Sequence, residues 1–311
     1  MVAGLVTFLL GLKSVARIDS LVNTDQGKMA RDRDYLPTPI KRQLRREAKF
    51  GCCFCGHSIG QYHHIVPYSE CNNHDPAHMM FVCLICHDKI TKNLFSRLEQ
   101  YEAKNSPFNQ RNNSCSGSLL NKQNYVALDV GGGVFLVGDF LSFTVDDKVI
   151  LEFRRNEMGF LDISGEIRNS NDEIIALLDR NEWICDSNDL WDVEVDWHKL
   201  TIREKFGKSS FELDTNKKPM TLKANLFFGG SIFSFSNSGF SAFHGSWASS
   251  AGSSLENIGV VNSTFAIKST GLQVVAAPGG GILISETDPR RRLYRCVEIF
   301  KQRRRSGNLN V

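Results

Sequence analysis

The chain has 311 residues, of which 41% are hydrophobic and 23% charged, a composition typical of a soluble globular protein with room for two domains. Its formal net charge is only +3, from 37 Lys and Arg against 34 Asp and Glu. A net charge this small does not by itself indicate a nucleic-acid partner. The basic residues are nevertheless concentrated at 41–49 and 290–305, and this placement carries more information than the sum.

Residues 1–34 are expected to form an N-terminal extension. The apolar stretch VAGLVTFLLGL at 2–12 is too short to span a bilayer, and no basic residue precedes it as in a signal peptide. It could form a short docking helix, or it could be a non-native extension from an upstream start codon, with Met29 as the natural start. The sequence therefore predicts no membrane partner.

A helix is predicted over residues 38–49, TPIKRQLRREAK, with Thr38 as its cap and Pro39 in its first turn. Ile40, Leu44 and Ala48 recur at every fourth position and predict the buried face. The basic residues of this segment lie off that face, where a solvated basic surface is the simplest interpretation.

Two Cys-x-x-Cys pairs follow, and each can place two thiolates on one tight turn. Two such pairs make a tetrahedral Cys₄ zinc site, so we expect a structural Zn²⁺ ion on four ligands, Cys52, Cys55, Cys83 and Cys86. Cys53 lacks the required spacing to Cys55, and the remaining cysteines show no pairing pattern. This usage indicates a metal site in a reducing compartment, and we expect a cytoplasmic protein.

A histidine cluster lies between and beside the two cysteine pairs. Five of the eight histidines of the chain fall within 25 residues: His63, His64, His74, His78 and His87. His63 and His64 are adjacent in a predicted strand, QYHHIV, and successive side chains of a strand point to opposite faces. The two imidazoles are therefore expected to have different roles.

Beyond the cysteines, residues 86–104 predict one helix with Ile90, Leu94 and Leu98 on one side. The Asn- and Ser-rich stretch that follows predicts a linker and a domain boundary at 106–120. The expected division is a small domain at 35–105, this linker, and a second domain at 121–311.

The second domain is predicted to be mainly β. Short β-branched or aromatic runs alternate with turn residues from about Tyr125 onward, and a hairpin is expected around Asn169–Asp172. Residues 229–281 are rich in Gly and Ser and leave three interpretations open: sandwich strands with long loops, a solenoid-like fold, or partly disordered chain. The basic C-terminal tail carries apolar residues that could dock it. The whole chain is thus expected to be α+β, a small zinc-stapled domain followed by a predominantly β domain.

The segments CCFCG, YHHIVP and HDPAHMMFVCLICHDKITK together resemble the HNH endonucleases of the His-Me finger (ββα-metal) group whose finger is flanked by zinc knuckles. The resemblance covers about residues 35–105. It implies that His63 and His87 bind a catalytic divalent ion and that His64 is the general base. The central Asn of the family falls on His78, which the resemblance gives the role of steadying the base, and His74 competes for that role.

The chemistry implied is hydrolysis of phosphodiester bonds in DNA, most simply double-stranded. Neutral imidazole suits activation of water near pH 7, and an ion with open positions suits charge neutralisation. Mg²⁺, Mn²⁺ and Ni²⁺ all remain candidates for that ion because imidazole also suits softer metals. Basic residues on two helices are expected to contact phosphates without reading sequence: Arg42, Arg45, Arg46, Lys89, Lys92 and Arg97.

No carboxylate pair, nucleophile triad or phosphate-binding loop is recognisable in the second domain. We therefore expect it to regulate, assemble or target the nuclease, through a protein partner or a homo-oligomer. The architecture suggests a role in antiviral defence, phage biology or mobile-element biology. The alternatives are a catalytically inactive zinc-finger-like module that binds DNA or protein, and, more weakly, a toxin-like effector.

Overall fold

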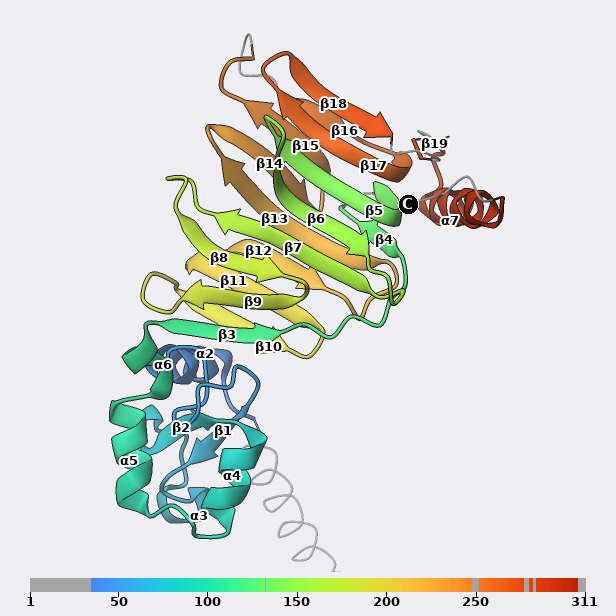
Figure 1. Ribbon diagram of the computed structural model, residues 1–311. Helices are drawn as coiled ribbons and strands as arrows, with labels where there is room; N and C mark the ends of the chain where they lie inside the picture. Colours follow the sequence, from blue (N-terminus) through green and yellow to red (C-terminus); the bar gives the residue numbers. More distant parts are fainter. Residues whose placement is uncertain (1–34, 132, 248–251, 277–279, 282–283, 307–311) are drawn as a thin grey trace, which may run out of the picture.

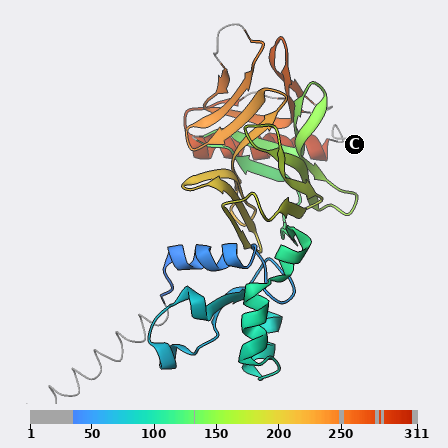
Figure 2. The same cartoon turned by 90° about the vertical axis from the view of Figure 1, so that its left-hand side faces the viewer.

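The computed structural model describes residues 35–131, 133–247, 252–276, 280–281 and 284–306 (Figure 1). The expected N-terminal extension lies outside the described residues. The chain is mixed α+β with strands predominating, and it comprises a small helical region that carries a two-stranded sheet, followed by a large β region. Figures 1 and 2 show the small region at one end of the molecule and the helix α2 between the two.

The small region holds the cysteine and histidine motifs. Its strands β1 and β2 form an antiparallel hairpin in which His63 is opposite Met80 and His64 opposite Met79. The elements in chain order are α2 (Thr38–Glu47), β1 (Gln61–His64), α3 (Tyr68–Cys71), the 3-10 helix η1 (Pro76–His78), β2 (Met79–Val82), α4 (Leu84–Thr91), α5 (Arg97–Asn105) and α6 (Phe108–Asn112).

Helix α2 confirms the helix predicted at 38–49, ending at Glu47. Leu44 and Ala48 are each 1% exposed, so the predicted buried face is also confirmed. Pro37 rather than Thr38 is the N-cap residue, with Pro39 in the first turn. The helix ends in a loop where Lys49 and Phe50 have positive φ angles.

The single helix predicted at 86–104 is wrong, because the chain forms two helices there. Helix α4 ends at Thr91, and two residues later Asn93 adopts a left-handed conformation with φ of 57°. Ser96 then starts α5 with a capping box, in which its hydroxyl accepts from the Glu99 N–H and the Glu99 carboxylate accepts from the Ser96 N–H. The sequence SRLE already contained this start signal.

The β region consists of two facing layers. One layer follows the pairing order β3-β9-β8-β7-β6-β5-β17-β18, and the other follows β10-β11-β12-β13-β14-β15-β16. Strand β4 connects them, because it pairs antiparallel with β5 and parallel with β13. Between the sandwich and the solenoid left open by the sequence, two facing layers correspond to the sandwich. The hairpin predicted at Asn169–Asp172 joins β7 to β8 and is confirmed.

Strands such as β13 and β14 alternate buried side chains with more accessible ones, as expected where one face of a layer is packed. Their bounds are β3 (Ser114–Ser118), β4 (Val126–Asp129), β5 (Phe135–Val145), β6 (Lys148–Arg155), β7 (Leu161–Arg168), β8 (Ile174–Asp179), β9 (Glu182–Asp186), β10 (Asp192–Asp196), β11 (Lys199–Lys205), β12 (Lys208–Asp214), β13 (Met220–Phe228), β14 (Ser231–Ser236), β15 (Gly239–His244), β16 (Ser253–Leu255), β17 (Ile258–Lys268), β18 (Gly271–Ala276) and β19 (Ile284–Ser285).

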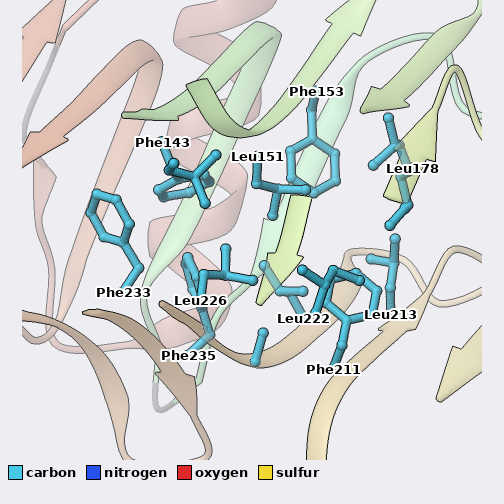
Figure 3. Packing of buried hydrophobic residues seen from close by; sticks show 14 of the residues in the cluster. Phe143, Leu151, Phe153, Leu178, Phe211, Leu213, Leu222, Leu226, Phe233 and Phe235 are labelled. Atoms are coloured by element: carbon cyan, nitrogen blue, oxygen red, sulfur yellow. The ribbon is translucent and has the colours of Figure 1, made fainter. Parts of the chain in front are cut away.

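The main hydrophobic core lies between the layers. Figure 3 shows Phe143, Leu151, Phe153 and Leu178 on one side facing the side chains of the other layer. Phe143 is fully buried, and its ring contacts those of four other phenylalanines, Phe233, Phe235, Phe240 and Phe265. This core is the principal source of stability of the β region.

The prediction of a linker at 106–120 is wrong, because most of this segment forms a helix and a strand. Residues 108–112 form α6, and residues 114–118 form β3, which pairs along its length with β9. Small residues suit this strand because it packs closely: a Cβ atom on Gly117 would lie 2.3 Å from Ser58 Oγ. The pairing also brings Cys115 opposite Cys185, with their Sγ atoms 2.9 Å apart, which no spacing pattern predicted.

The C-terminal helix α7 (Pro289–Arg305) packs against β5 and β17 and keeps much of its basic surface exposed (Figure 1). Cys296 and Phe300 are buried against Val137 and Val261. A Cβ atom on Gly259 would lie 2.1 Å from Cys296 Sγ, so the helix can approach the sheet only over a glycine there.

Candidate metal centre and histidine site

The four predicted zinc ligands converge at the junction of two loops and a helix start. The Sγ atom of Cys55 lies 3.6 Å from that of Cys83 and 3.8 Å from that of Cys86, and all four sulfurs lie within 4.8 Å of one another. A tetrahedral site with Zn–S bonds of about 2.3 Å has S···S edges of about 3.8 Å. The four cysteines therefore fit a metal such as zinc.

The local fold explains how the sulfurs are aimed. Cys83 is the N-cap residue of α4, where its sulfur accepts from the Cys86 N–H, so one turn of helix holds both thiols on the same side. Burial raises the pKa of the Cys52 thiol to about 11, although nearby backbone N–H groups oppose that shift. A bound cation would offset this cost by stabilising the thiolate form.

His63 and His87 lie together beside this cluster. Their ring centroids are 5.1 Å apart with the rings nearly perpendicular, so strand β1 and helix α4 direct them at the same place. Burial, followed by the charge of His87, lowers the pKa of His63 to about 4. His63 is therefore neutral near pH 7, which is the form in which imidazole binds a metal.

Gln100 of α5 orients His63. The Nε2 atom of His63 lies 3.1 Å from Gln100 Oε1, and Gln100 Nε2 donates to the carbonyl of Phe95, which fixes the amide so that its oxygen faces the imidazole. An Nε2–H donated to that oxygen leaves Nδ1 of His63 as the atom with a free lone pair. Gln100 was not recognised in the sequence, because nothing in its local pattern indicates a partner 37 residues away.

His64 has a different environment, as strand alternation predicts. Its Nε2 atom lies 3.1 Å from His74 Nδ1, and the ring of Tyr68 lies near both imidazoles. One of the two histidines donates and the other accepts, so His74 restrains the orientation of His64. The segment between the hairpin strands, which contains α3, supplies both His74 and Tyr68.

His78 does not occupy the place predicted for it next to His64. Its Nδ1 atom lies 2.7 Å from the hydroxyl of Tyr101, and its carbonyl accepts from the N–H of Ile65. His78 thus ties helix α5 to the end of the hairpin, while His74 is the imidazole hydrogen-bonded to His64. The contact with His64 that the resemblance assigned to His78 is therefore made by its competitor, His74.

The prediction that Arg45 of α2 contacts a phosphate is wrong. Its side chain is buried and donates to both carboxylate oxygens of Asp192 on β10 and to the hydroxyl of Tyr62 on β1. Burial disfavours the charged guanidinium, but Asp192 outweighs that effect and raises the pKa of Arg45. Arg45 therefore joins the two regions and is not available to a phosphate.

Arg42 and Arg46 differ from Arg45. Arg42 is partly exposed, with its guanidinium 4.1 Å from the centre of the Trp191 ring and its Nε atom 3.5 Å from Asp192. Arg46 is exposed. Both line a groove of about 600 Å³ between α2 and the β region.

The basic residues predicted beyond His87 are all on the surface. Lys89 is exposed, Lys92 pairs with Asp88 at 2.7 Å, and Arg97 pairs with Glu70 at 2.8 Å. Exposed ion pairs of this kind are worth little, so these side chains can exchange their partners for phosphates at small cost.

No family model, curated protein or solved structure matches this chain. Among the described residues, no helix is long and apolar enough to cross a membrane. Within the same residues, the four cysteines are the only group of three or more His, Cys, Asp or Glu side chains close enough to share a metal ion. The histidine pair would thus offer an ion two protein ligands and leave its other positions open.

Proposed function

We propose that this protein is a metal-dependent endonuclease that cleaves DNA phosphodiester bonds. The observation that carries the proposal is the apposition of His63 and His87, with His64 on the next position of the strand, in a strand–strand–helix unit beside the cysteine cluster. This arrangement supports the same three roles that the HNH resemblance implies.

His63 and His87 would hold the divalent ion, which is Mg²⁺, Mn²⁺ or Ni²⁺. When bound, such an ion neutralises charge on the phosphate and stabilises the leaving oxygen. His64 would accept a proton from the attacking water. His74 and Tyr68 would hold His64 in place, and the cysteine cluster with zinc would keep β1 and α4 in register.

The substrate is proposed to be double-stranded DNA, contacted by Lys89, Lys92 and Arg97 around helix α4. Such contacts position the backbone and read no base sequence. The β region would regulate the nuclease, assemble it or sense its target, with defence against phage as the context that the architecture suggests. The catalytically inactive zinc-finger-like module is the alternative outcome of the experiment below.

The test is cleavage of supercoiled plasmid by zinc-loaded protein with added Mg²⁺, Mn²⁺ or Ni²⁺. His64→Ala is expected to lower the rate at least 100-fold, because it removes the base. His87→Ala should lower it by impairing ion binding, and extra metal should restore part of that loss. His244→Ala is the matched control, since this histidine hydrogen-bonds Ser246 in the β region.

Cleavage that survives His64→Ala would contradict the assigned base. No cleavage by the wild type with any of the three ions, and none after removal of residues 119–311, would favour the inactive module. Zinc content is measured for every variant, so that loss of the fold is separated from loss of chemistry.

A further inference from the structure

A cation and two aromatic rings are stacked at the edge of the groove between α2 and the β region, where Arg42 and Trp191 line the groove and Phe206 lies next to them. Arg42 lies 4.1 Å over the Trp191 ring and 6.0 Å from the Phe206 ring, and the two aromatic rings meet edge to face at 5.3 Å. Arg42, Trp191 and Phe206 are called the stacking platform below. It combines residues from α2, the start of β10 and the β11–β12 turn.

Phe206 is unusually exposed for a large apolar side chain. It lies in the two-residue turn between Lys205 and Lys208, next to Gly207 with φ of 72°, and it is 79% exposed. A single exposed phenylalanine needs no explanation. Here, however, the ring meets a cationic stack at the edge of a groove, and its exposure leaves ring surface free for a further planar group.

The charge beside the stacking platform is positive. Three guanidinium groups, from Arg42, Arg45 and Arg203, converge on the carboxylate of Asp192, which is fully buried. Glu194 compensates Arg45 and Arg203 but makes no ion pair with Arg42. Among the described residues, the ion pair of Arg42 is the 3.5 Å contact of its buried Nε atom with Asp192, so Arg42 is the least compensated guanidinium of the three. Its side chain is 22% exposed at the groove, where an outside anion can reach it.

The rest of the groove has the same character. Arg46 and Lys49 line it, and its one carboxylate, Glu47, is already paired with Lys104. Phosphates suit the cations, and bases suit aromatic and guanidinium planes, so this combination favours single-stranded nucleic acid. An acidic protein partner would use the cations but would leave the exposed Phe206 ring without a planar partner.

We propose that the stacking platform binds unpaired nucleotides, with a base on Phe206 and the adjoining phosphates on Arg42 and Arg46. The choice of nucleic acid as partner rests on the proposed function. The platform is also attached to the histidine strand, because Arg45 of α2 hydrogen-bonds Tyr62, the residue before His63. Helix α2 therefore contacts both the proposed nucleotide site, through Arg42 and Arg46, and strand β1, through Arg45.

The experiment is a binding titration of a fluorescent oligo-dT, and of a duplex of the same length, by fluorescence anisotropy. Full-length zinc-loaded protein is used without added divalent ion, so that no cleavage occurs. Phe206→Ala is expected to weaken single-strand binding about ten-fold, the range found for one lost base stack, and to change duplex binding less than two-fold. Arg42→Lys keeps the charge but loses the planar stack, so it should weaken single-strand binding about three-fold.

Two matched controls separate this site from the general surface. Phe160→Ala removes a 55% exposed ring from the β6–β7 turn, and Arg180→Ala removes an exposed guanidinium from the β8–β9 turn. Both should bind the single strand as the wild type does. Because Phe206 is mostly exposed, an unchanged melting temperature of Phe206→Ala excludes unfolding as the cause of weaker binding.

Equal single-strand affinity of wild type and Phe206→Ala would overturn the proposal, as would equal losses for single strand and duplex. Absence of single-strand binding by the wild type would overturn it too and would favour a protein partner. The same His64→Ala protein that fails to cut plasmid should bind oligo-dT normally. If the wild type binds the single strand through the platform but never cuts DNA, the proposed endonuclease function is wrong and this inference stands.

Discussion

The two regions of this chain are stabilised in different ways. The small region buries a short apolar cluster that includes three of the four proposed zinc ligands, Cys52, Cys83 and Cys86, whereas the β region buries a continuous core between two layers. A small core rarely supplies enough stability alone, and metal ligation is a usual supplement. The stability of the small region therefore depends on its metal ligands and on the contact through α2, whereas the stability of the β region depends on its packing.

The largest expected effect is loss of zinc. Chelation, or Cys86→Ala, should unfold the small region, because structural zinc contributes about 10–16 kcal/mol to folding of small zinc domains. All four tryptophans, at positions 183, 191, 197 and 247, lie in the β region, so their fluorescence reports mainly that region, and Trp191 also senses its contact with Arg42 of α2. We expect their urea transition to persist while hairpin signals disappear from NMR spectra. Cys71→Ser is the control, and a similar collapse in that variant would contradict the assigned ligands.

The second largest effect is expected in the β region, with the zinc site left intact. Phe143→Ala should destabilise the β region by about 3–5 kcal/mol, because the fully buried ring leaves a cavity among four other phenylalanines. Urea unfolding followed by tryptophan fluorescence measures this loss, and zinc stoichiometry should not change. Phe160→Ala should cost less than about 1 kcal/mol, since that ring is exposed. Zinc loss in Phe143→Ala under native conditions would mean that the regions do not fold separately.

A smaller effect is expected at the contact between the regions. Asp192→Asn leaves the buried Arg45 without its carboxylate partner and should cost about 3 kcal/mol. Zinc release, followed with a chromogenic chelator, reports unfolding of the small region, and tryptophan fluorescence reports unfolding of the β region. The two unfolding transitions should lie closer together in the wild type than in this variant. Asp179→Asn breaks only an exposed pair with Arg180 and is the control. Unchanged separation of the transitions in Asp192→Asn would show that this ion pair does not couple the two regions.

The smallest effect concerns protons at the histidine site. The imidazole resonances of His63 should titrate near pH 4, because burial and the charge of His87 lower its pKa from 6.5. Between these two values the unfolded chain binds more protons at this residue than the folded chain, so its contribution to stability rises with pH across that window. His87→Ala should raise the midpoint. A midpoint near 6.5 in the zinc-loaded wild type would contradict the buried environment of His63.

Local patterns predicted the parts of the molecule that depend on short-range geometry. The buried face of α2 and the β7–β8 hairpin follow from periodicity and turn residues, and the cysteine cluster follows from two spaced pairs. The break between α4 and α5 was also encoded locally, in Asn93 and in the Ser96–Glu99 capping box. The prediction overlooked it because the apolar residues continue through the break.

The buried face of α2, the alternation that separates His63 from His64, and the donor set suited to zinc follow from residue type and near neighbours, so they can be predicted without the fold. Three features could not be predicted in this way: the contact of His74 rather than His78 with His64, the orientation of His63 by Gln100, and the burial of Arg45 against Asp192. Each of these contacts is made by side chains that meet only when separate elements pack. No periodicity or spacing records which polar groups will share a buried space.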